Sequence, residues 1–169
     1  MSAGDAPTSA AGAHALYRDL VLEHKRRPRN FGTLTPHTHA ADGVNALCGD
    51  RLRIELDCRA GRVLAVRFSG ESCAIATASA SMLSEHVVGL DAAAIADAAA
   101  RFARLIEGEV DADASLGELQ ALGELRDHAA RRKCALLPWA TLAAALDGRE
   151  HATTEASDRA SVPGAAAPD

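Results

Sequence analysis

Three cysteines and one aspartate are the residues of this chain best suited to chemistry. Cys48 and Asp50 flank Gly49, and Cys73 and Cys134 follow much later in the chain. Because glycine permits a tight turn, the Cys48 thiol and the Asp50 carboxylate can face one ion. A set of three sulfurs and one oxygen suits zinc or iron and disfavours magnesium or calcium. None of the spacings is the CxxC pattern typical of zinc sites, and the alternative is that Asp50 caps a turn while the cysteines are buried apolar residues.

The sequence around the two later cysteines favours anionic sulfur. Cys73 and Cys134 each stand where the apolar pattern predicts the start of a helix, and the dipole and unpaired amides of a helix N-terminus stabilise a thiolate. Arg131 and Lys133 place positive charge beside Cys134, which favours the thiolate further. The alternative for Arg131 is a position in a solvated turn. Since a thiolate is the form that binds a metal ion, both cysteines are candidate ligands.

The elements that must position these residues follow from the spacing of apolar side chains. Charged and apolar residues alternate over residues 51–58, which predicts a half-buried strand in which Cys58 faces inward as a small core residue. A turn at Gly61 leads to a second strand over residues 64–68, so the two strands form an antiparallel hairpin. Residues 30–45 carry turn-forming types and are interpreted as a loop. Apolar periodicity and stop signals predict helices over residues 13–26, 74–88, 91–107, 116–125 and 134–148.

Composition indicates one domain with short tails. The 169 residues are 48% hydrophobic but only 3% aromatic, so the core must be built from Leu, Val, Ile and Ala, and abundant alanine favours helices. We expect a single domain over residues 13–148. Residues 1–12 and 149–169 are small and polar, and we expect them to form disordered tails.

The charge balance and the missing targeting signals narrow the function. A formal net charge of -5 excludes a general nucleic-acid binder. The basic run over residues 24–29 has two interpretations, a solvated helix end or a docking patch for an acidic protein partner. No apolar run is long enough to span a membrane and no secretory signal is recognisable, so we expect a cytoplasmic protein. Its four cysteines would then stay reduced and be free to bind metal or carry sulfur.

Several short motifs extend the pattern around these four residues. They are Leu16-Tyr17-Arg18, Pro28-Arg29-Asn30, residues 45–50, 70–75, 78–82, 116–119 and 130–135. Together they closely resemble the SufU branch of the IscU/NifU-N family of iron-sulfur cluster biogenesis proteins, over residues 16–146. The long segment between Cys73 and Cys134 matches that branch, as does Lys133 where IscU scaffolds have histidine. Ala46 stands where the family commonly has proline, and this change removes no ligand.

The resemblance implies an α+β fold in which a small, mostly antiparallel three-stranded sheet packs against about five helices. Cys48, Asp50, Cys73 and Cys134 match the family's metal-ligand positions, and zinc is the implied metal. The implied activity is that of a zinc-dependent sulfurtransferase, in which Cys48 accepts the outer sulfur of a persulfide formed by a SufS-like cysteine desulfurase. Arg131 matches the arginine of the SufU branch, and we interpret it as a group that stabilises the thiolate.

Two other functions are compatible with the same four residues. One is a scaffold on which a [2Fe-2S] cluster, or iron, is held and passed to acceptor proteins or to other cluster assembly proteins. Lys133 in place of histidine weighs against the scaffold. The other is a domain that zinc merely stabilises, without a reaction.

Overall fold

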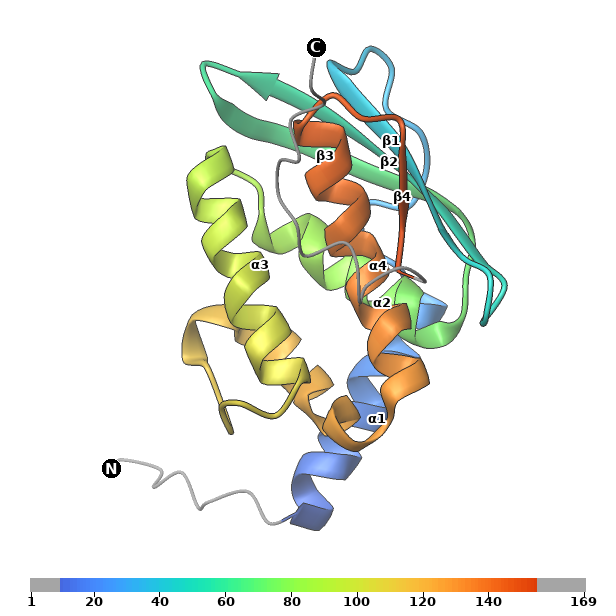
Figure 1. Cartoon of the computed structure of the whole chain (residues 1–169), viewed down its shortest axis with the longest axis vertical. Coiled ribbons are helices and arrows are strands. Elements are labelled where there is room, and N and C mark those ends of the chain that lie inside the picture. The colour runs from blue at the N-terminus through green and yellow to red at the C-terminus, as the bar shows by residue number, and fades with distance from the viewer. Residues whose placement is uncertain (1–9, 155–169) are drawn as a thin grey trace, which may run out of the picture.

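The computed structural model describes residues 10–154, and residues 1–9 and 155–169 lie outside the described part of the chain. The helices are α1 (Ala10–Arg26), α2 (Ala74–His86), α3 (Ala92–Ile106), the 3-10 segment η1 (Ala114–Asp127) and α4 (Ala129–Leu146). The strands are β1 (His39–Asn45), β2 (Asp50–Arg59), β3 (Arg62–Glu71) and β4 (His151–Thr153). This is the predicted α+β class (Figure 1).

The four strands form one sheet in the order β3-β2-β1-β4. The pairs β1–β2 and β2–β3 are antiparallel, as predicted for a three-stranded sheet, and the hairpin predicted from the alternating pattern is β2–β3. The fourth strand was not predicted. It pairs with β1 in parallel, so the sheet is mixed.

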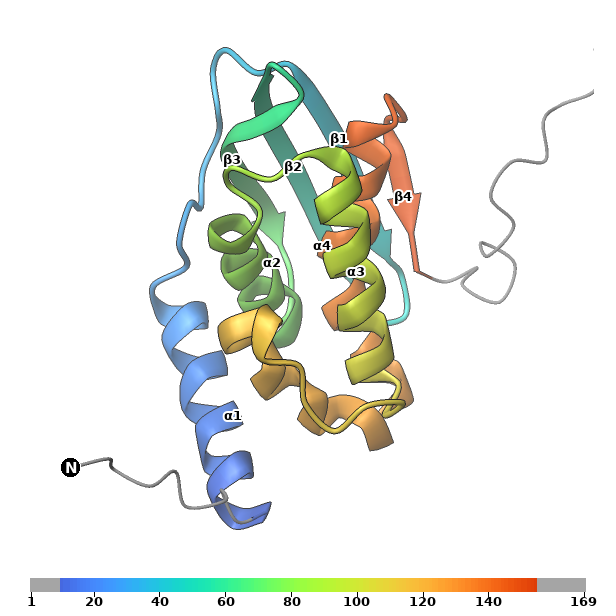
Figure 2. The same cartoon turned by 90° about the vertical axis from the view of Figure 1, so that its left-hand side faces the viewer.

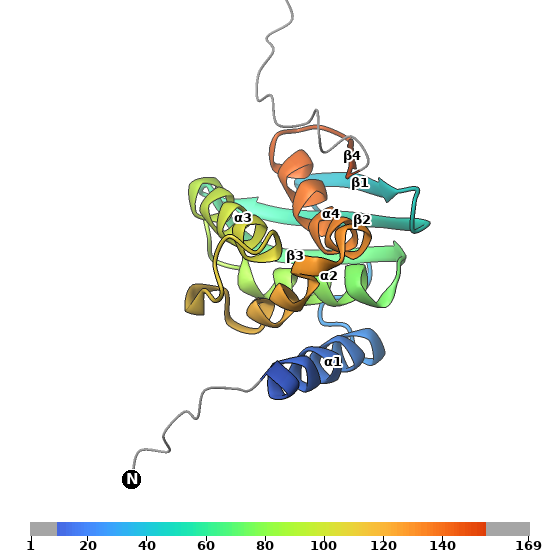
Figure 3. The same cartoon turned by 60° about the horizontal axis from the view of Figure 1, so that its bottom comes forward.

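The helices cover one face of the sheet. Figure 3 shows α2, α3 and α4 side by side against the strands, and Figure 2 shows α1 on the outer side of α2. In agreement, α4 packs on β1, β2 and α2, while α1 packs on α2 and η1. Phe102 and Trp139 stack between α3 and α4 with ring centroids 5.3 Å apart. None of the helices within residues 10–154 is long and apolar enough to cross a membrane.

Three expectations about element boundaries were wrong. Strand β1 lies within the segment interpreted as a loop, because its inward residues Ala41, Gly43 and Asn45 are too small or too polar to give an apolar signal. Helix α4 starts at Ala129, well before Cys134, because the polar residues before the cysteine form exposed turns of the helix. Parts of both predicted tails belong to ordered elements: α1 begins at Ala10, and β4 lies beyond residue 149. The rest of both tails lies outside the described residues.

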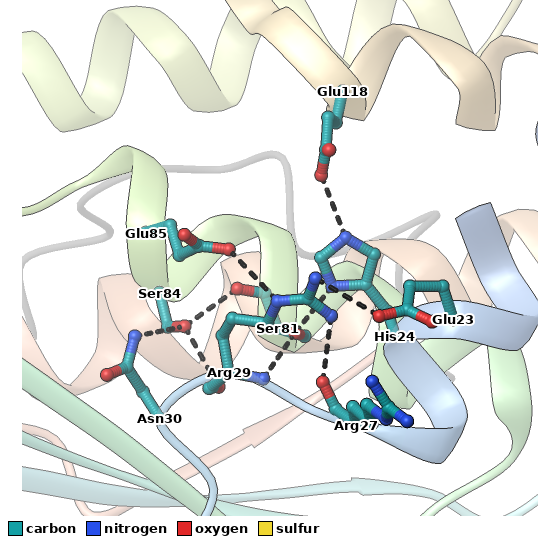
Figure 4. Close-up of polar contacts among 9 residues, drawn as sticks. All are labelled: Glu23, His24, Arg27, Arg29, Asn30, Ser81, Ser84, Glu85 and Glu118. Carbon is teal, nitrogen blue, oxygen red and sulfur yellow. Dashed lines mark hydrogen bonds and ion pairs between the residues drawn. The ribbon is translucent and has the colours of Figure 1, made fainter.

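A buried histidine joins α1 to α2 and η1. His24 is 1% exposed, and its ring nitrogens contact the Ser81 hydroxyl at 2.6 Å and the Glu118 carboxylate at 2.8 Å (Figure 4). Arg29 lies beside this network, where its backbone N–H donates to Ser81 and its guanidinium faces Glu23 and Glu85. The basic run predicted from sequence therefore does not act as one solvated patch: its first and last members hold the helices together.

Replacing His24 with alanine should lower the free energy of unfolding by about 2–4 kcal/mol, because it opens a cavity and removes two side-chain contacts at once. Urea unfolding followed by circular dichroism measures this change. The matched control is His14→Ala in the same helix. His14 is 57% exposed and lies 3.7 Å from Glu124, so its loss should cost less than about 0.5 kcal/mol. Equal effects of the two variants would contradict a structural role for the His24 network.

Candidate metal centre

The tight turn between β1 and β2 presents the first thiol. Asn45 and Asp50 face each other at the end of the β1–β2 ladder, and the turn between them closes with a hydrogen bond from the Gly49 N–H to the Ala46 carbonyl at 3.3 Å. Gly49 has a φ of 70°, a conformation that glycine adopts without strain, as the sequence suggested. Cys48 is exposed on this turn, next to Leu47, which is 71% exposed.

Asp50 is fully buried and links the turn to the start of α2. One carboxylate oxygen accepts the Cys73 backbone N–H at 2.7 Å, and the other lies 3.8 Å from the Cys73 sulfur. The first contact fixes the carboxylate, and the second leaves an oxygen facing the thiols. Asp50 therefore both caps the local backbone and lies among the sulfur atoms, which combines the two interpretations of its role.

Cys73 is the N-cap of α2, as predicted for a cysteine at a helix start. Its sulfur accepts the Ala76 N–H at 3.4 Å. The hydrogen bond with Cys134 lowers the pKa of Cys73 to about 7, against the opposing effect of burial, and the Ala76 N–H adds to the lowering. In the metal-free protein Cys73 is thus the thiol that gives up its proton readily.

Cys134 is buried in α4 and comes within reach of the turn. Its sulfur lies 3.0 Å from the Cys48 sulfur, and it accepts a hydrogen bond from the Asn45 side-chain amide at 3.6 Å. Its hydrogen bond to Cys73, together with burial, raises the pKa of Cys134 above its usual value. The position at a helix start predicted for this cysteine was wrong, so its environment is set by neighbouring side chains and not by a helix N-terminus.

Arg131 lies on the wall of the space beside these thiols. A cavity of about 350 Å³ is lined by Tyr17, Val21 and Arg131 together with Cys48, Cys73 and Cys134. Burial raises the pKa of Tyr17, and the nearby Arg131 guanidinium acts in the opposite direction. The structure thus brings all five sequence-predicted site residues to one place.

Two residues of this neighbourhood had no role in the sequence analysis. Tyr17 and Asn45 were noted only as members of motifs that carried the family resemblance. The signal available for Asn45 was a polar side chain three positions before Cys48. The fourth cysteine, Cys58, lies at the other end of β2, half-buried against the core, and burial raises the pKa of its thiol. Lys133 is half-buried and does not line the cavity.

Three of the four donor atoms are close enough for a small tetrahedral site, and the fourth, from Cys73, lies at its edge. Ligand bonds of about 2.0 to 2.3 Å place the ligand atoms of such a site about 3.3 to 3.8 Å apart. Ligand atoms of Cys48, Asp50 and Cys134 lie within 4.8 Å of one another. The Cys73 sulfur lies outside this group of three but 3.8 Å from an Asp50 oxygen, so it would have to move closer to Cys48 to complete a four-ligand site. Three sulfurs and one carboxylate oxygen suit zinc or iron.

The sequence matches one family model and is similar to curated proteins of sulfur transfer and iron-sulfur cluster assembly. Residues 16–148 match the family model described as the NifU-like N terminal domain. The chain is 35% identical to the zinc-dependent sulfurtransferase SufU of Bacillus subtilis over 133 residues, which cover 78% of this chain and 90% of that protein. It is 28% identical to the iron-sulfur cluster assembly scaffold protein IscU of Thermotoga maritima over 131 residues, or 92% of that protein.

Solved structures agree on the fold. A crystal structure of a hypothetical protein superposes with a TM-score of 0.74 at 30% identity and covers 79% of this chain. A SUF-system candidate scaffold protein from Fervidobacterium islandicum superposes with a TM-score of 0.73 at 24% identity, covering 80% of this chain and 99% of that one. In both comparisons the matched region spans nearly the whole of the solved structure, so the likeness extends over the full domain.

Proposed function

Since the chain belongs to the family of NifU-like N-terminal domains, we propose that it is an iron-sulfur cluster biogenesis protein that works as a zinc-dependent sulfurtransferase. In this proposal it accepts persulfide sulfur from a SufS-like cysteine desulfurase. Cys48, Asp50, Cys73 and Cys134 hold the zinc ion. The reaction takes place in the cytoplasm, where thiols stay reduced.

The observation that carries the proposal is the unequal burial of the four side chains. Cys48 is exposed on a turn, whereas Asp50 and Cys134 are buried and Cys73 is half-buried as a helix cap. A partner protein can therefore reach Cys48 directly. A site that served only to stabilise the fold would have no need to present one sulfur to solvent.

The reaction follows from this exposure. The Cys48 thiolate attacks the outer sulfur of the protonated desulfurase persulfide, and the bond between that sulfur and the desulfurase cysteine breaks. The desulfurase cysteine leaves as a thiolate, and Cys48 keeps the transferred sulfur with its proton as a new persulfide. Bound zinc would keep the cysteines deprotonated, and it has no redox chemistry that would consume a persulfide.

The other residues hold the site while Cys48 reacts. With zinc bound, Cys48 would have to come off the ion in order to attack, and we propose that the desulfurase would supply a temporary ligand in its place. Asp50 stays fixed by the Cys73 N–H, and Cys134 stays fixed within α4. Arg131, beside Tyr17 at the cavity wall, places positive charge where the desulfurase cysteine leaves as a thiolate.

Desulfurase turnover measured with zinc-loaded and chelator-stripped protein tests the proposal. The zinc-loaded protein should be colourless, should contain about one zinc per chain and should stimulate turnover, because the thiols are then deprotonated and oriented. The stripped protein should lose most of this stimulation and regain it when zinc is restored. Equal stimulation by both samples would contradict zinc dependence, and a brown protein that passes a cluster to acceptor proteins would establish the scaffold function instead.

A further inference from the structure

We propose that Asn45 is a positioning residue that holds Cys134 on the metal while Cys48 is away. The inference rests on the proposed function, because it assumes that Cys48 detaches during sulfur transfer. Asn45 is the last residue of β1, and its side chain is fully buried. Its amide nitrogen donates to the Cys134 sulfur at 3.6 Å, a contact between the strand that leads into the turn and helix α4.

The chemistry of the contact matches a metal-bound sulfur. A thiolate has no proton to donate, so it can only accept hydrogen bonds, and the amide NH₂ group of asparagine is a donor that stays neutral at every working pH. Because this donor does not titrate, it stabilises the sulfur at every pH at which the metal is bound. Hydrogen-bond partners of metal ligands orient the ligands in the same way in many metal sites.

The other end of the Asn45 side chain supports the same conclusion. Its carbonyl oxygen is buried and has no hydrogen-bond partner among the described residues. Leaving a buried acceptor unpaired costs about 1–3 kcal/mol, so an asparagine that served only the fold would be poorly placed. A side chain kept there despite this cost is explained by what its N–H does for Cys134.

The position of Asn45 also explains how one ligand can move while the others stay. Asn45 pairs with Asp50 across the ladder, so the base of the turn is fixed to β2 and, through the Cys134 contact, to α4. Cys48 lies beyond this base, on the exposed part of the turn. The turn can therefore swing Cys48 outward without carrying Asp50 or Cys134 with it.

The test uses Asn45→Ala and Asn45→Asp, both of which remove the N–H donor. Asn45→Asp keeps the size of the side chain and carries the test if alanine leaves a damaging cavity. Zinc release to a chelator should be about 10- to 100-fold faster in both variants. In cobalt-substituted protein, the sulfur-to-cobalt charge-transfer band should move to lower energy, because the sulfur loses the hydrogen bond that stabilised its lone pair.

Ser79→Ala is the matched control. Ser79 is fully buried and donates to the Ala135 carbonyl, so its loss removes a buried hydrogen bond to α4 one residue from Cys134 but leaves the sulfur untouched. It should leave the cobalt band in place. An unchanged band and wild-type zinc release in both Asn45 variants, or the same band shift in Ser79→Ala, would overturn the proposal. These readouts need no desulfurase, so their failure is distinguishable from a failure of sulfur transfer.

Discussion

Cys48→Ala will reduce desulfurase stimulation to the turnover of the desulfurase alone, and mass spectrometry will find no transferred sulfur on the variant. The side chain is exposed on the β1–β2 turn, so its loss should change the free energy of unfolding of the metal-free protein by no more than about 0.5 kcal/mol. Activity is lost because no other thiol of the site is exposed: Cys134 is buried and Cys73 is half-buried. Fold and reaction should thus separate cleanly in this variant.

Cys58→Ala is the control for Cys48→Ala. It removes a thiol at the far end of β2 and should leave stimulation and sulfur acceptance intact. We expect a small loss of stability, because Cys58 packs against the core. Transferred sulfur found on Cys73 or Cys134 in the wild-type complex would contradict the assignment of Cys48 as acceptor. Global unfolding of Cys48→Ala would instead identify the metal as a purely structural element.

Gly43→Val should damage the fold and the metal centre together. A side chain at Gly43 would overlap the Thr141 hydroxyl and press on Leu137, because α4 lies directly on β1 at this point. Overpacking of this kind typically costs about 1–3 kcal/mol, and we expect the upper end because the neighbour is a buried helix. Since β1 leads to Cys48 and α4 carries Cys134, moving them apart should also speed zinc release. Urea unfolding and chelator competition measure the two effects.

Ala40→Val in the same strand is the control for Gly43→Val. Ala40 lies on the opposite face of β1 and is half-buried, so the added methyl groups meet no helix. A second comparison uses Gly43→Ala alone and combined with Thr141→Ala. If the contact with Thr141 causes the damage, the double variant should recover part of the lost stability. Equal stability of Gly43→Val and Ala40→Val would show that α4 can move without cost.

The parts of the fold that were predictable have strong local patterns. Alternating charged and apolar residues over residues 51–58, followed by a turn, predicted the β2–β3 hairpin. The alanine-rich segment after Cys73 predicted α2 with the cysteine at its N-terminus. Strand β1 has no such pattern, because close packing of α4 demands glycine at position 43. Strand β4 is polar, and only its pairing with β1, distant in sequence, makes it a strand. Both depend on contacts that local sequence does not carry.

The candidate site was predictable in its members but not in its connections. Cysteine and aspartate types, with the family resemblance, identified the four proposed ligands and Arg131. The contacts that organise them join residues far apart in the chain, as Asn45 joins Cys134 and Tyr17 joins Arg131. Periodicity cannot reveal such pairs. Cys134 is the clearest example. The sequence placed it at a helix start, but α4 begins at Ala129, and the sulfur instead accepts a hydrogen bond from Asn45 of β1.

The spread of the ligands along the chain has a consequence for biosynthesis. During synthesis Cys48 and Asp50 emerge from the ribosome early, but Cys134 emerges only after most of the domain has been made. Strand β4 follows α4 and pairs with β1, the strand that leads into the turn. A nascent chain therefore cannot close the proposed four-ligand site before the first turns of its last helix, which carry Cys134, have been made. Because a preformed site does not exist in an unassembled chain, the proposed zinc ion would be held by all four ligands only after α4 has packed beside the β1–β2 turn, which couples full zinc binding to tertiary assembly.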